Sequence, residues 1–220
     1  MAPIGFAIFD LDGTLIDSRR DLADSANAML AGYSASPMAE ADIARMVGCG
    51  AATLVTRVLK AANVDAPIPD ALERFLAAYD ERLTHHTRPY DGVPELLDHL
   101  KSREVPMAIL TNKPLQQMAS ILESFTLSKY FRWSVGGDGP WPRKPSPDGL
   151  RYLMSRAAVG PGETVMVGDS SVDLETARNA GVRICLARYG FGFADLAPGA
   201  LNGDEWLADS PRAIAALIGV

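Results

Sequence analysis

The sequence predicts an α/β fold, in which helices cover both faces of a parallel β-sheet and a helical cap is inserted after the first strand. From residue 88 onward, short apolar runs alternate with segments of helical periodicity, as is typical of parallel sheets. Residues 15–87 hold helical patterns only and separate the first apolar run, residues 4–9, from the others. We therefore assign residues 1–14 and 88–220 to a core and residues 15–87 to the cap.

The composition fits a globular protein and argues against several classes of partner. The chain has 220 residues, 48% of them hydrophobic, a length at which a full core forms without disulfides. A net charge of −6 without a basic stripe argues against nucleic acid. No apolar run approaches the ~18 residues of a membrane span, and no signal-peptide pattern is present. Cys49 and Cys185 are interpreted as buried free thiols of a reducing compartment. We expect a cytoplasmic protein, either monomer or homodimer.

The first predicted strand ends in two acids. Its continuous apolar run is typical of a strand buried on both faces, and Gly13 marks the turn that follows. Because Asp10 and Asp12 stand two residues apart, extended backbone would direct both side chains to the same side. An ordinary strand–turn boundary would also use Asp and Gly.

The cap segment is predicted to hold four helices. Asp17 or Ser18 is expected to cap the first of them, and Gly32 to end it. A turn of small residues, Gly48-Cys49-Gly50, separates the second helix from the third. The apolar stripes of the four helices span residues 22–30, 43–47, 54–59 and 72–83.

The remainder of the chain is predicted to alternate between strands and helices. The expected strands span residues 106–111, 131–135, 164–168 and 182–187, with an edge strand at 205–208. The expected helices lie near residues 93–100, 115–125, 148–158 and 171–180. Asp209 or Ser210 is expected to cap a last helix, with Pro211 in its first position.

Four clusters of polar residues lie near the ends of these strands. They are Asp10 with Asp12, Thr111-Asn112-Lys113, Lys144, and Gly168-Asp169-Ser170-Ser171-Val172-Asp173. The carboxyl ends of parallel strands meet on one edge of a sheet, so we expect the clusters to share one crevice.

This set of side chains suits phosphoryl transfer. A carboxylate can attack phosphorus and form an aspartyl phosphate, and a divalent metal must then bridge the carboxylate and the phosphate. Asp10 and Asp169 would bind the metal, Lys144 would add a fixed positive charge, and Asp12 would protonate the leaving alcohol. Two neutral donors for the substrate phosphate follow the second strand of the core: Thr111 and Asn112.

Each cluster taken alone also has a structural explanation. Thr111-Asn112 could cap the following helix, Lys144 could be a solvated loop residue, and Asp169 could belong to an ordinary strand–helix turn. Asp173 could be a first-turn acid that complements a helix dipole. Together these explanations are weaker, because they do not account for a full phosphoryl-transfer set on one edge of the sheet.

The four clusters, in order, resemble the four motifs of the haloacid dehalogenase-like hydrolases. The matching stretches are Phe9–Thr14, Thr111–Pro114, Arg143–Pro147 and Val167–Asp173. The resemblance implies a Rossmann-like core with strand order 5-4-1-2-3, an inserted helical cap, and Mg²⁺ as cofactor. It also implies that Thr111 and Lys144 bind the substrate phosphate.

The same resemblance implies roles for the acids. By motif position, Asp10 resembles the nucleophile and a metal ligand. Asp12 resembles the general acid/base, with its backbone carbonyl on Mg²⁺. Asp169 resembles the metal-binding acid, and Asp173 resembles a residue that supports the metal waters or Lys144.

Within this family the chain is most similar to phosphoglycolate phosphatases. The similar stretches are Val47–Ala51 with Leu54-Val55, Gly136–Asp138 and Tyr189-Gly190. The similarity implies that the turn of Gly48, Cys49 and Gly50 sets specificity and that Arg57 meets a substrate carboxylate. A surface helix arginine is the simpler interpretation of Arg57.

The sequence thus predicts a Mg²⁺-dependent phosphatase acting on a small phosphorylated metabolite, with 2-phosphoglycolate favoured. A phosphatase for another sugar or metabolite phosphate, or a phosphosugar mutase, would keep both aspartates, although Gly13-Thr14-Leu15 is more similar to the phosphatases. A dehalogenase would not need Asp12, and a phosphonate hydrolase would need a cap lysine where only Lys60 stands. A non-enzymatic binding or regulatory module would be expected to lack one of the core functional side chains, and none is missing.

Overall fold

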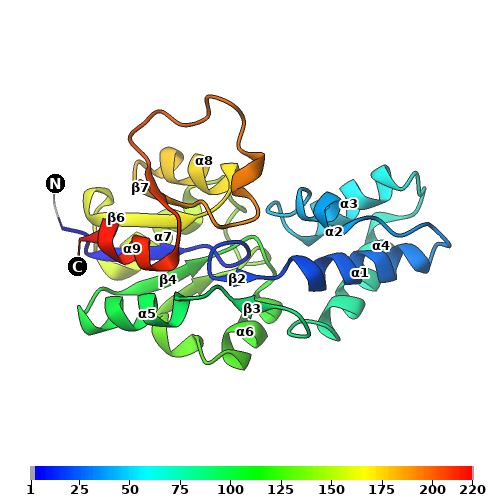
Figure 1. Ribbon diagram of the computed structural model, residues 1–220, viewed down its shortest axis with the longest axis horizontal. Coiled ribbons are helices and arrows are strands. Elements are labelled where there is room, and N and C mark those ends of the chain that lie inside the picture. The colour runs from blue at the N-terminus through cyan, green and yellow to red at the C-terminus, as the bar shows by residue number, and fades with distance from the viewer. Residues whose placement is uncertain (1–2, 220) are drawn as a thin grey trace.

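The computed structural model describes residues 3–219. Its centre is a six-stranded sheet in the order β5-β4-β1-β6-β7-β8, in which all neighbouring strands run parallel (Figure 1). The strands are β1 (Phe6–Phe9), β4 (Met107–Leu110), β5 (Trp133–Val135), β6 (Thr164–Gly168), β7 (Arg183–Ala187) and β8 (Trp206–Ala208). Numbered within the sheet alone, the order is 3-2-1-4-5-6. This confirms the predicted order and adds the predicted edge strand beside β7.

Helices cover both faces of the sheet. They are α5 (Val93–Ser102), α6 (Leu115–Ser124), α7 (Asp148–Ala157), α8 (Ser171–Ala180) and α9 (Pro211–Ile218), with short 3-10 turns at Ser128–Tyr130, Pro161–Glu163 and Phe193–Asp195. Alternate residues of β1 face different layers. Ala7 and Phe9 belong to one apolar cluster with residues of α5, α6 and α9, whereas Phe6 and Ile8 belong to another with residues of α7 and α8. Both faces of β1 are buried, which explains its unbroken apolar run.

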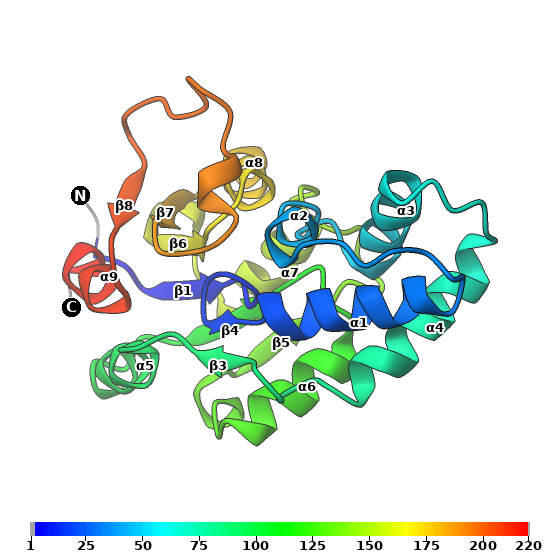
Figure 2. The ribbon, with the colours of Figure 1, turned by 45° about the vertical axis from the view of Figure 1, so that its right-hand side comes forward.

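The insertion after β1 is helical, as predicted, and lies beyond the carboxyl edge of the sheet (Figures 1 and 2). It contains α1 (Arg19–Ala31), α2 (Glu40–Ala44), α3 (Ala51–Ala61) and α4 (Ile68–Asp80). These helices share an apolar cluster of their own, in which Met29, Ile43, Val58 and Phe75 are all buried. The cap therefore holds its shape by its own packing. The boundaries 15 and 87 remain a prediction.

One strand was missed within the segment expected to hold only helices. Residues Ile16–Asp17 form β2, which pairs antiparallel with β3 (Arg88–Pro89). A two-residue strand is too short to show an alternating pattern, so periodicity did not reveal it. The pair joins the two chain segments that lead into and out of the cap.

Asp21 fastens the same two segments together. This residue of α1 is fully buried, and its carboxylate accepts hydrogen bonds from the backbone N–H groups of His86 and Thr87 and from the Thr87 hydroxyl, at 2.7–3.0 Å. A carboxylate with several donors is satisfied away from water. The entry and exit of the cap are thus linked at one place.

The predicted helix caps differ in outcome. Ser210 caps α9 as expected, since its hydroxyl accepts the Ala213 N–H at 3.3 Å, and Pro211 begins the helix. Ser18 precedes α1 but does not cap it, because its hydroxyl donates to Asp12 instead. The Arg19 N–H is met by the Asp17 carboxylate.

Two further findings concern expectations drawn from composition. Over residues 3–219, no helix combines the length and apolarity needed to cross a membrane. Both cysteines are free; Cys185 is buried as predicted, but Cys49 is only partly buried, because it lies on a loop that lines a cavity.

Candidate active site

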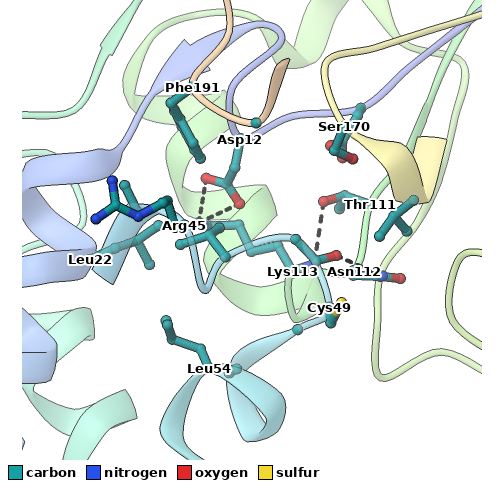
Figure 3. Close-up of a pocket in the computed structure, with 18 of the residues that line it drawn as sticks. Asp12, Leu22, Arg45, Cys49, Leu54, Thr111, Asn112, Lys113, Ser170 and Phe191 are labelled. Atoms are coloured by element: carbon teal, nitrogen blue, oxygen red, sulfur yellow. Dashed lines mark hydrogen bonds and ion pairs between the residues drawn. The ribbon is translucent and has the colours of Figure 1, made fainter. Parts of the chain in front are cut away.

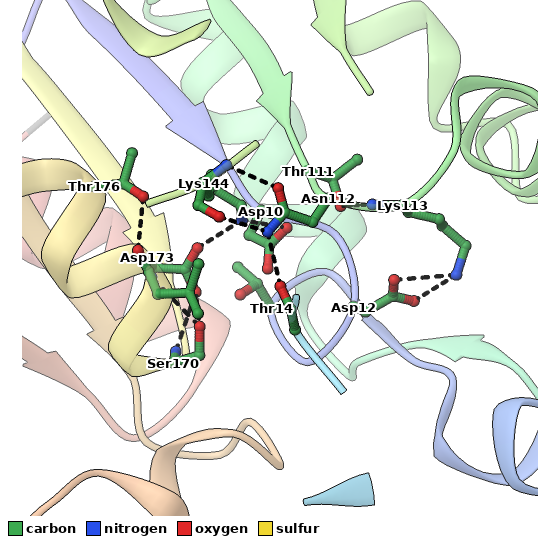
Figure 4. A network of polar contacts seen from close by, with 12 residues as sticks. Asp10, Asp12, Thr14, Thr111, Asn112, Lys113, Lys144, Ser170, Asp173 and Thr176 are labelled. Carbon is green, nitrogen blue, oxygen red and sulfur yellow. Dashed lines mark hydrogen bonds and ion pairs between the residues drawn. The ribbon is translucent and has the colours of Figure 1, made fainter. Parts of the chain in front are cut away.

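The polar clusters meet at the carboxyl edge of three adjacent strands. Asp10 follows β1 and Thr111 follows β4 (Figure 4). Asp169 follows β6, and β1 pairs with both β4 and β6. The first strand ends at Phe9, so Asp10 and Asp12 lie in the loop beyond it rather than in extended strand.

Three buried acids form the centre of the site. Carboxylate oxygens of Asp10, Asp169 and Asp173 all lie within 4.8 Å of one another. Burial raises the pKa of Asp10 to about 6, although the positive charge of Lys144 opposes that rise. Burial, and then the charge of Asp173, raise the pKa of Asp169 well above its usual value. Like charges this close in a low dielectric are unfavourable, so the cluster favours a cation or protons.

Lys144 supplies one positive charge to the cluster. Its Nζ lies 2.8 Å from Oδ1 of Asp10 and 2.6 Å from Oδ1 of Asp173, and the side chain is 2% exposed. Burial lowers the pKa of Lys144, but Asp10 and Asp173 more than offset this and raise it overall. Lys144 therefore stays charged in the site.

Asn112 holds Lys144 by its backbone. The Asn112 side chain accepts the Lys144 N–H at 2.9 Å and donates to the Lys144 carbonyl at 3.0 Å. Its amide also donates to the Gly48 carbonyl of the cap at 2.9 Å. The two amide hydrogens are thus committed to the lysine loop and the cap, which leaves the backbone N–H for the predicted phosphate contact. That contact and the predicted role of Thr111, whose hydroxyl accepts the Lys113 N–H at 3.2 Å, remain predictions.

Asp173 is fixed by the start of α8. Its Oδ2 accepts from the Ser170 hydroxyl at 2.6 Å and from the N–H groups of Ser170 and Asp169, while Ser170 caps the Asp173 N–H in return. Gly168 makes room for this arrangement, since a Cβ there would lie 2.4 Å from the Asp173 Cβ. With Oδ2 fully used, Oδ1 holds Lys144. The supporting role expected for Asp173 remains a prediction.

Asp169 is oriented by two loops. The Gly192 N–H donates to its Oδ2 at 2.8 Å, and the Thr14 hydroxyl lies 3.4 Å from its Oδ1. Gly13 has a positive φ of 84°, and a Cβ there would lie 2.0 Å from Oδ2 of Asp169. The glycine after the second acid is thus required both by the turn and by the approach of Asp169.

A second lysine–acid pair was missed in the sequence. Lys113 Nζ lies 2.8 and 3.0 Å from the two carboxylate oxygens of Asp12 and 2.5 Å from the Tyr79 hydroxyl of the cap. The Ser18 hydroxyl donates to Asp12 at 2.6 Å. Figure 4 shows this pair apart from the Lys144 cluster. Lys113 belongs to a recognised polar cluster, but only the fold shows that it is buried and points at Asp12.

The cap closes the site over a cavity of about 350 Å³ (Figure 3). The turn of Gly48, Cys49 and Gly50 lines it, and so does Arg57, while their predicted roles in specificity remain predictions. The Arg57 guanidinium donates to the Met46 carbonyl at 2.9 Å and contacts Cys49 Sγ at 3.5 Å, so it braces this turn. Most cap side chains around the cavity are apolar: Leu22, Val47, Leu54, Phe75 and Leu76.

A further cap cation, Arg45, also lines the cavity and was not singled out in the sequence. It ends α2 and pairs with Asp42 of the same helix. The helical pattern alone did not show that this exposed residue borders the cavity.

The residues present fit a divalent cation. Oδ1 of Asp10 is buried and accepts no well-aligned hydrogen bond among the described residues, although Lys144 Nζ lies 2.8 Å away. Four carboxylates face two ammonium groups in the site, which leaves an excess of two negative charges. Oxygen ligands and this charge suit Mg²⁺. The predicted metal contact of the Asp12 carbonyl remains a prediction.

The raised acid pKa values predict how pH affects the metal-free protein. Asp10 and Asp169 bind protons more tightly when folded than when unfolded, so stability is greatest below about pH 4 for these groups and falls as pH rises through 6. The change in the protonation of Asp10 alone alters the free energy of unfolding by on the order of 3 kcal/mol. With chelator, we expect Tm to fall by roughly 5 °C or more between pH 5 and 7.5.

Added Mg²⁺ should raise Tm more at pH 7.5 than at pH 5, because it replaces the protons that the cluster otherwise needs. Thermal unfolding monitored by circular dichroism measures both shifts. Asp169→Asn is the matched variant and should lose most of the Mg²⁺-dependent increase. An equal increase at both pH values would contradict the assignment of the cation to this cluster.

Known proteins match this chain over most of its length. Residues 7–187 match the family described as haloacid dehalogenase-like hydrolase. Phosphoglycolate phosphatase 1 of Pseudomonas aeruginosa is 38% identical over 190 residues, covering 84% of this chain and 69% of that protein. The plasmid phosphoglycolate phosphatase of Cupriavidus necator is 36% identical over 220 residues, covering 98% of this chain and 94% of that protein.

A solved structure agrees with the fold over the full length. The crystal structure of a predicted phosphoglycolate phosphatase from Haemophilus somnus matches with a TM-score of 0.91 at 29% identity, and the match covers 99% of each chain. The sheet and the helical insertion are therefore both shared with that protein.

Proposed function

Because the chain belongs to the haloacid dehalogenase-like hydrolase family, we propose that it is a Mg²⁺-dependent phosphatase acting on a small phosphomonoester through an aspartyl phosphate on Asp10. The observation that carries this proposal is the environment of Asp10. Its buried Oδ1 accepts no well-aligned hydrogen bond among residues 3–219, while Lys144 and two further acids surround it. A buried carboxylate that is held beside a fixed positive charge and among other acids is suited to attack phosphorus.

The side chains divide the reaction between them. An Asp10 oxygen forms a bond to phosphorus as the bond to the leaving alcohol breaks, and Asp12 gives its proton to that leaving oxygen. Water then attacks the aspartyl phosphate, Asp12 takes the proton from the water, and inorganic phosphate leaves. Lys144 faces the charge that develops on the phosphoryl oxygens, with Thr111 as a further phosphate contact.

Mg²⁺ would be held by Asp10, Asp169 and the Asp12 carbonyl, and it would neutralise the repulsion between carboxylate and phosphate. Asp173 would act indirectly. Its carboxylate accepts a hydrogen bond from Lys144 at 2.6 Å, and it forms a capping box with Ser170 at the start of α8. The cap over the cavity would exclude water during the transfer.

The favoured substrate is 2-phosphoglycolate. Support comes from the similarity to phosphoglycolate phosphatases over nearly the whole chain. The cavity also offers Arg45 and Arg57 on the cap side, where a substrate carboxylate would lie opposite the phosphate. Another sugar or metabolite phosphate, a mutase reaction and a non-catalytic binding role are the alternatives. A cytoplasmic location and a monomeric or dimeric state remain predictions.

Phosphate release from a panel of small phosphomonoesters tests the proposal. The panel includes 2-phosphoglycolate, sugar phosphates and p-nitrophenyl phosphate, each with Mg²⁺ and with chelator. We expect 2-phosphoglycolate to have the highest kcat/KM and chelator to abolish release. Conversion of a sugar monophosphate to its isomer without phosphate release would favour the mutase, and a folded protein without any turnover would favour a binding role.

A further inference from the structure

Lys113 joins the cap to the core outside the phosphate-facing cluster. It follows β4, and its side chain is 3% exposed. An ammonium group has three hydrogens to donate, and here they face three acceptors: both oxygens of Asp12, at 2.8 and 3.0 Å, and the Tyr79 hydroxyl at 2.5 Å. Lys113 therefore has no donor left for a substrate in this arrangement.

Tyr79 is positioned by the cap. It lies in the last turn of α4, 2% exposed, and its ring stacks on that of Phe75 with centroids 5.8 Å apart. Both rings belong to the apolar cluster of the cap helices. One residue further along, Asp80 accepts a hydrogen bond from Gln117 of α6 at 2.8 Å. The end of α4 is thus one of the places where the cap contacts the core beyond β4.

Asp12 receives its other hydrogen bond from Ser18, which is fully buried directly before α1. Asp12 thus has two side-chain donors among the described residues. Ser18 stands where the chain leads into the cap, and Lys113 is hydrogen-bonded to Tyr79 of the cap. A change in cap position would alter the Tyr79 contact of Lys113 first. The ammonium would then lose one acceptor, and its position would no longer be fixed so that both hydrogen bonds to Asp12 form.

We propose that Lys113 is a positioning residue that makes the orientation of Asp12 depend on the docking of Tyr79 from the cap. The inference rests on the proposed function, in which Asp12 transfers a proton to the leaving group. In the docked state Lys113 holds the carboxyl group of Asp12 in one orientation at the edge of the cavity. One oxygen keeps its hydrogen bond from Lys113, and the other, when protonated, gives its proton to the leaving oxygen. In the undocked state Asp12 is released, so the proton transfer is efficient only when the cap covers the substrate.

The test uses leaving groups of different basicity. Alkyl phosphates require a proton on the leaving oxygen, whereas p-nitrophenolate departs without one. The ratio kcat/KM reports only the steps up to departure of the leaving group. A residue that positions Asp12 must therefore affect kcat/KM for the alkyl ester far more than for p-nitrophenyl phosphate. A residue that merely stabilises the fold would affect both esters equally.

The variants are Lys113→Met, Tyr79→Phe and the double variant. We expect Lys113→Met to lower kcat/KM for the best alkyl phosphate about 100-fold, and that for p-nitrophenyl phosphate less than tenfold. Tyr79→Phe, which keeps the stacked ring, should show the same selectivity with a loss of about fivefold to tenfold. The double variant should match Lys113→Met alone, because Tyr79 acts through Lys113.

Two substitutions serve as matched controls. Lys60→Met removes an exposed cap lysine, and Tyr33→Phe removes a cap hydroxyl that has no partner among the described residues. Both should keep wild-type kinetics. Circular dichroism checks that each variant is folded, and if Lys113→Met does not fold, the ester selectivity of Tyr79→Phe decides the question.

The outcomes separate this inference from the proposed function. Wild-type protein that hydrolyses neither ester overturns both. Active wild-type protein whose variants lose both esters equally, or whose two losses multiply in the double variant, overturns the inference alone. A loss that lies wholly in KM would also overturn it, since Lys113 would then bind the substrate rather than position Asp12.

Discussion

Asp10→Asn is expected to lower kcat by at least about 10⁴-fold while the protein stays folded. The amide is a poor nucleophile toward phosphorus, so no acyl phosphate forms. The substitution keeps the shape of the side chain and removes its buried charge. Burial already raises the pKa of Asp10 to about 6, so the loss of that charge should not unfold the protein. Phosphate release under saturating substrate and Mg²⁺ measures the loss, and circular dichroism measures the fold.

Asp65→Asn is the matched control, because Asp65 is exposed in a cap loop and should leave kcat unchanged. Mass spectrometry adds a direct check. A phosphorylated peptide spanning Asp10 should be trapped from wild-type protein during turnover, and none from Asp10→Asn. Substantial Mg²⁺-dependent activity in Asp10→Asn would rule out Asp10 as the nucleophile.

Lys144→Met is expected to affect both stability and activity. The change leaves Asp10 and Asp173 buried without their shared cation, which typically costs about 3–5 kcal/mol of the free energy of unfolding. It also removes the charge that we propose faces the phosphoryl oxygens, so kcat should fall by about 10³-fold. Urea unfolding at pH 7.5 and phosphate release by the folded protein measure the two effects separately.

The stability loss in Lys144→Met should be smaller at pH 5. Without the lysine, Asp10 takes up a proton more readily, and a neutral carboxyl group is less costly to bury. Lys60→Met, at an exposed cap position, should change stability by less than about 0.5 kcal/mol at either pH. A loss of stability in Lys144→Met that does not depend on pH would indicate altered packing rather than unpaired acids.

The sequence predicted the fold well because the apolar residues of its helices recur with a clear helical period and its strands are short apolar runs. β1 ends beside two acids, and the strands on either side, β4 and β6, each end beside another polar cluster. The meeting of Asp10 and Asp169, with Asp173 in the first turn of the helix that follows, then follows from parallel strand geometry. Lys144 is different, because it lies in the long loop after β5 and is held by long-range hydrogen bonds with Asn112.

The contacts that cross from cap to core could not be predicted in this way. Tyr79 belongs to an apolar helical stripe, and its hydroxyl finds Lys113 only because α4 ends above the segment after β4. The Asn112 amide likewise reaches the Gly48 carbonyl across 64 positions of sequence. Spacing along the chain assigns a residue to an element, whereas these contacts depend on how two separately packed bodies meet.

The stalk made by β2 and β3, with Asp21 of α1 hydrogen-bonded to the residues just before β3, has a consequence for how such a protein can change. Both ends of the insertion leave the core at neighbouring positions of one short ladder. A cap of another size or sequence could therefore be spliced in at this stalk without rerouting any strand of the sheet. Substrate selection by the cap and phosphate chemistry at the sheet would then be inherited as separable units, each encoded by its own part of the chain.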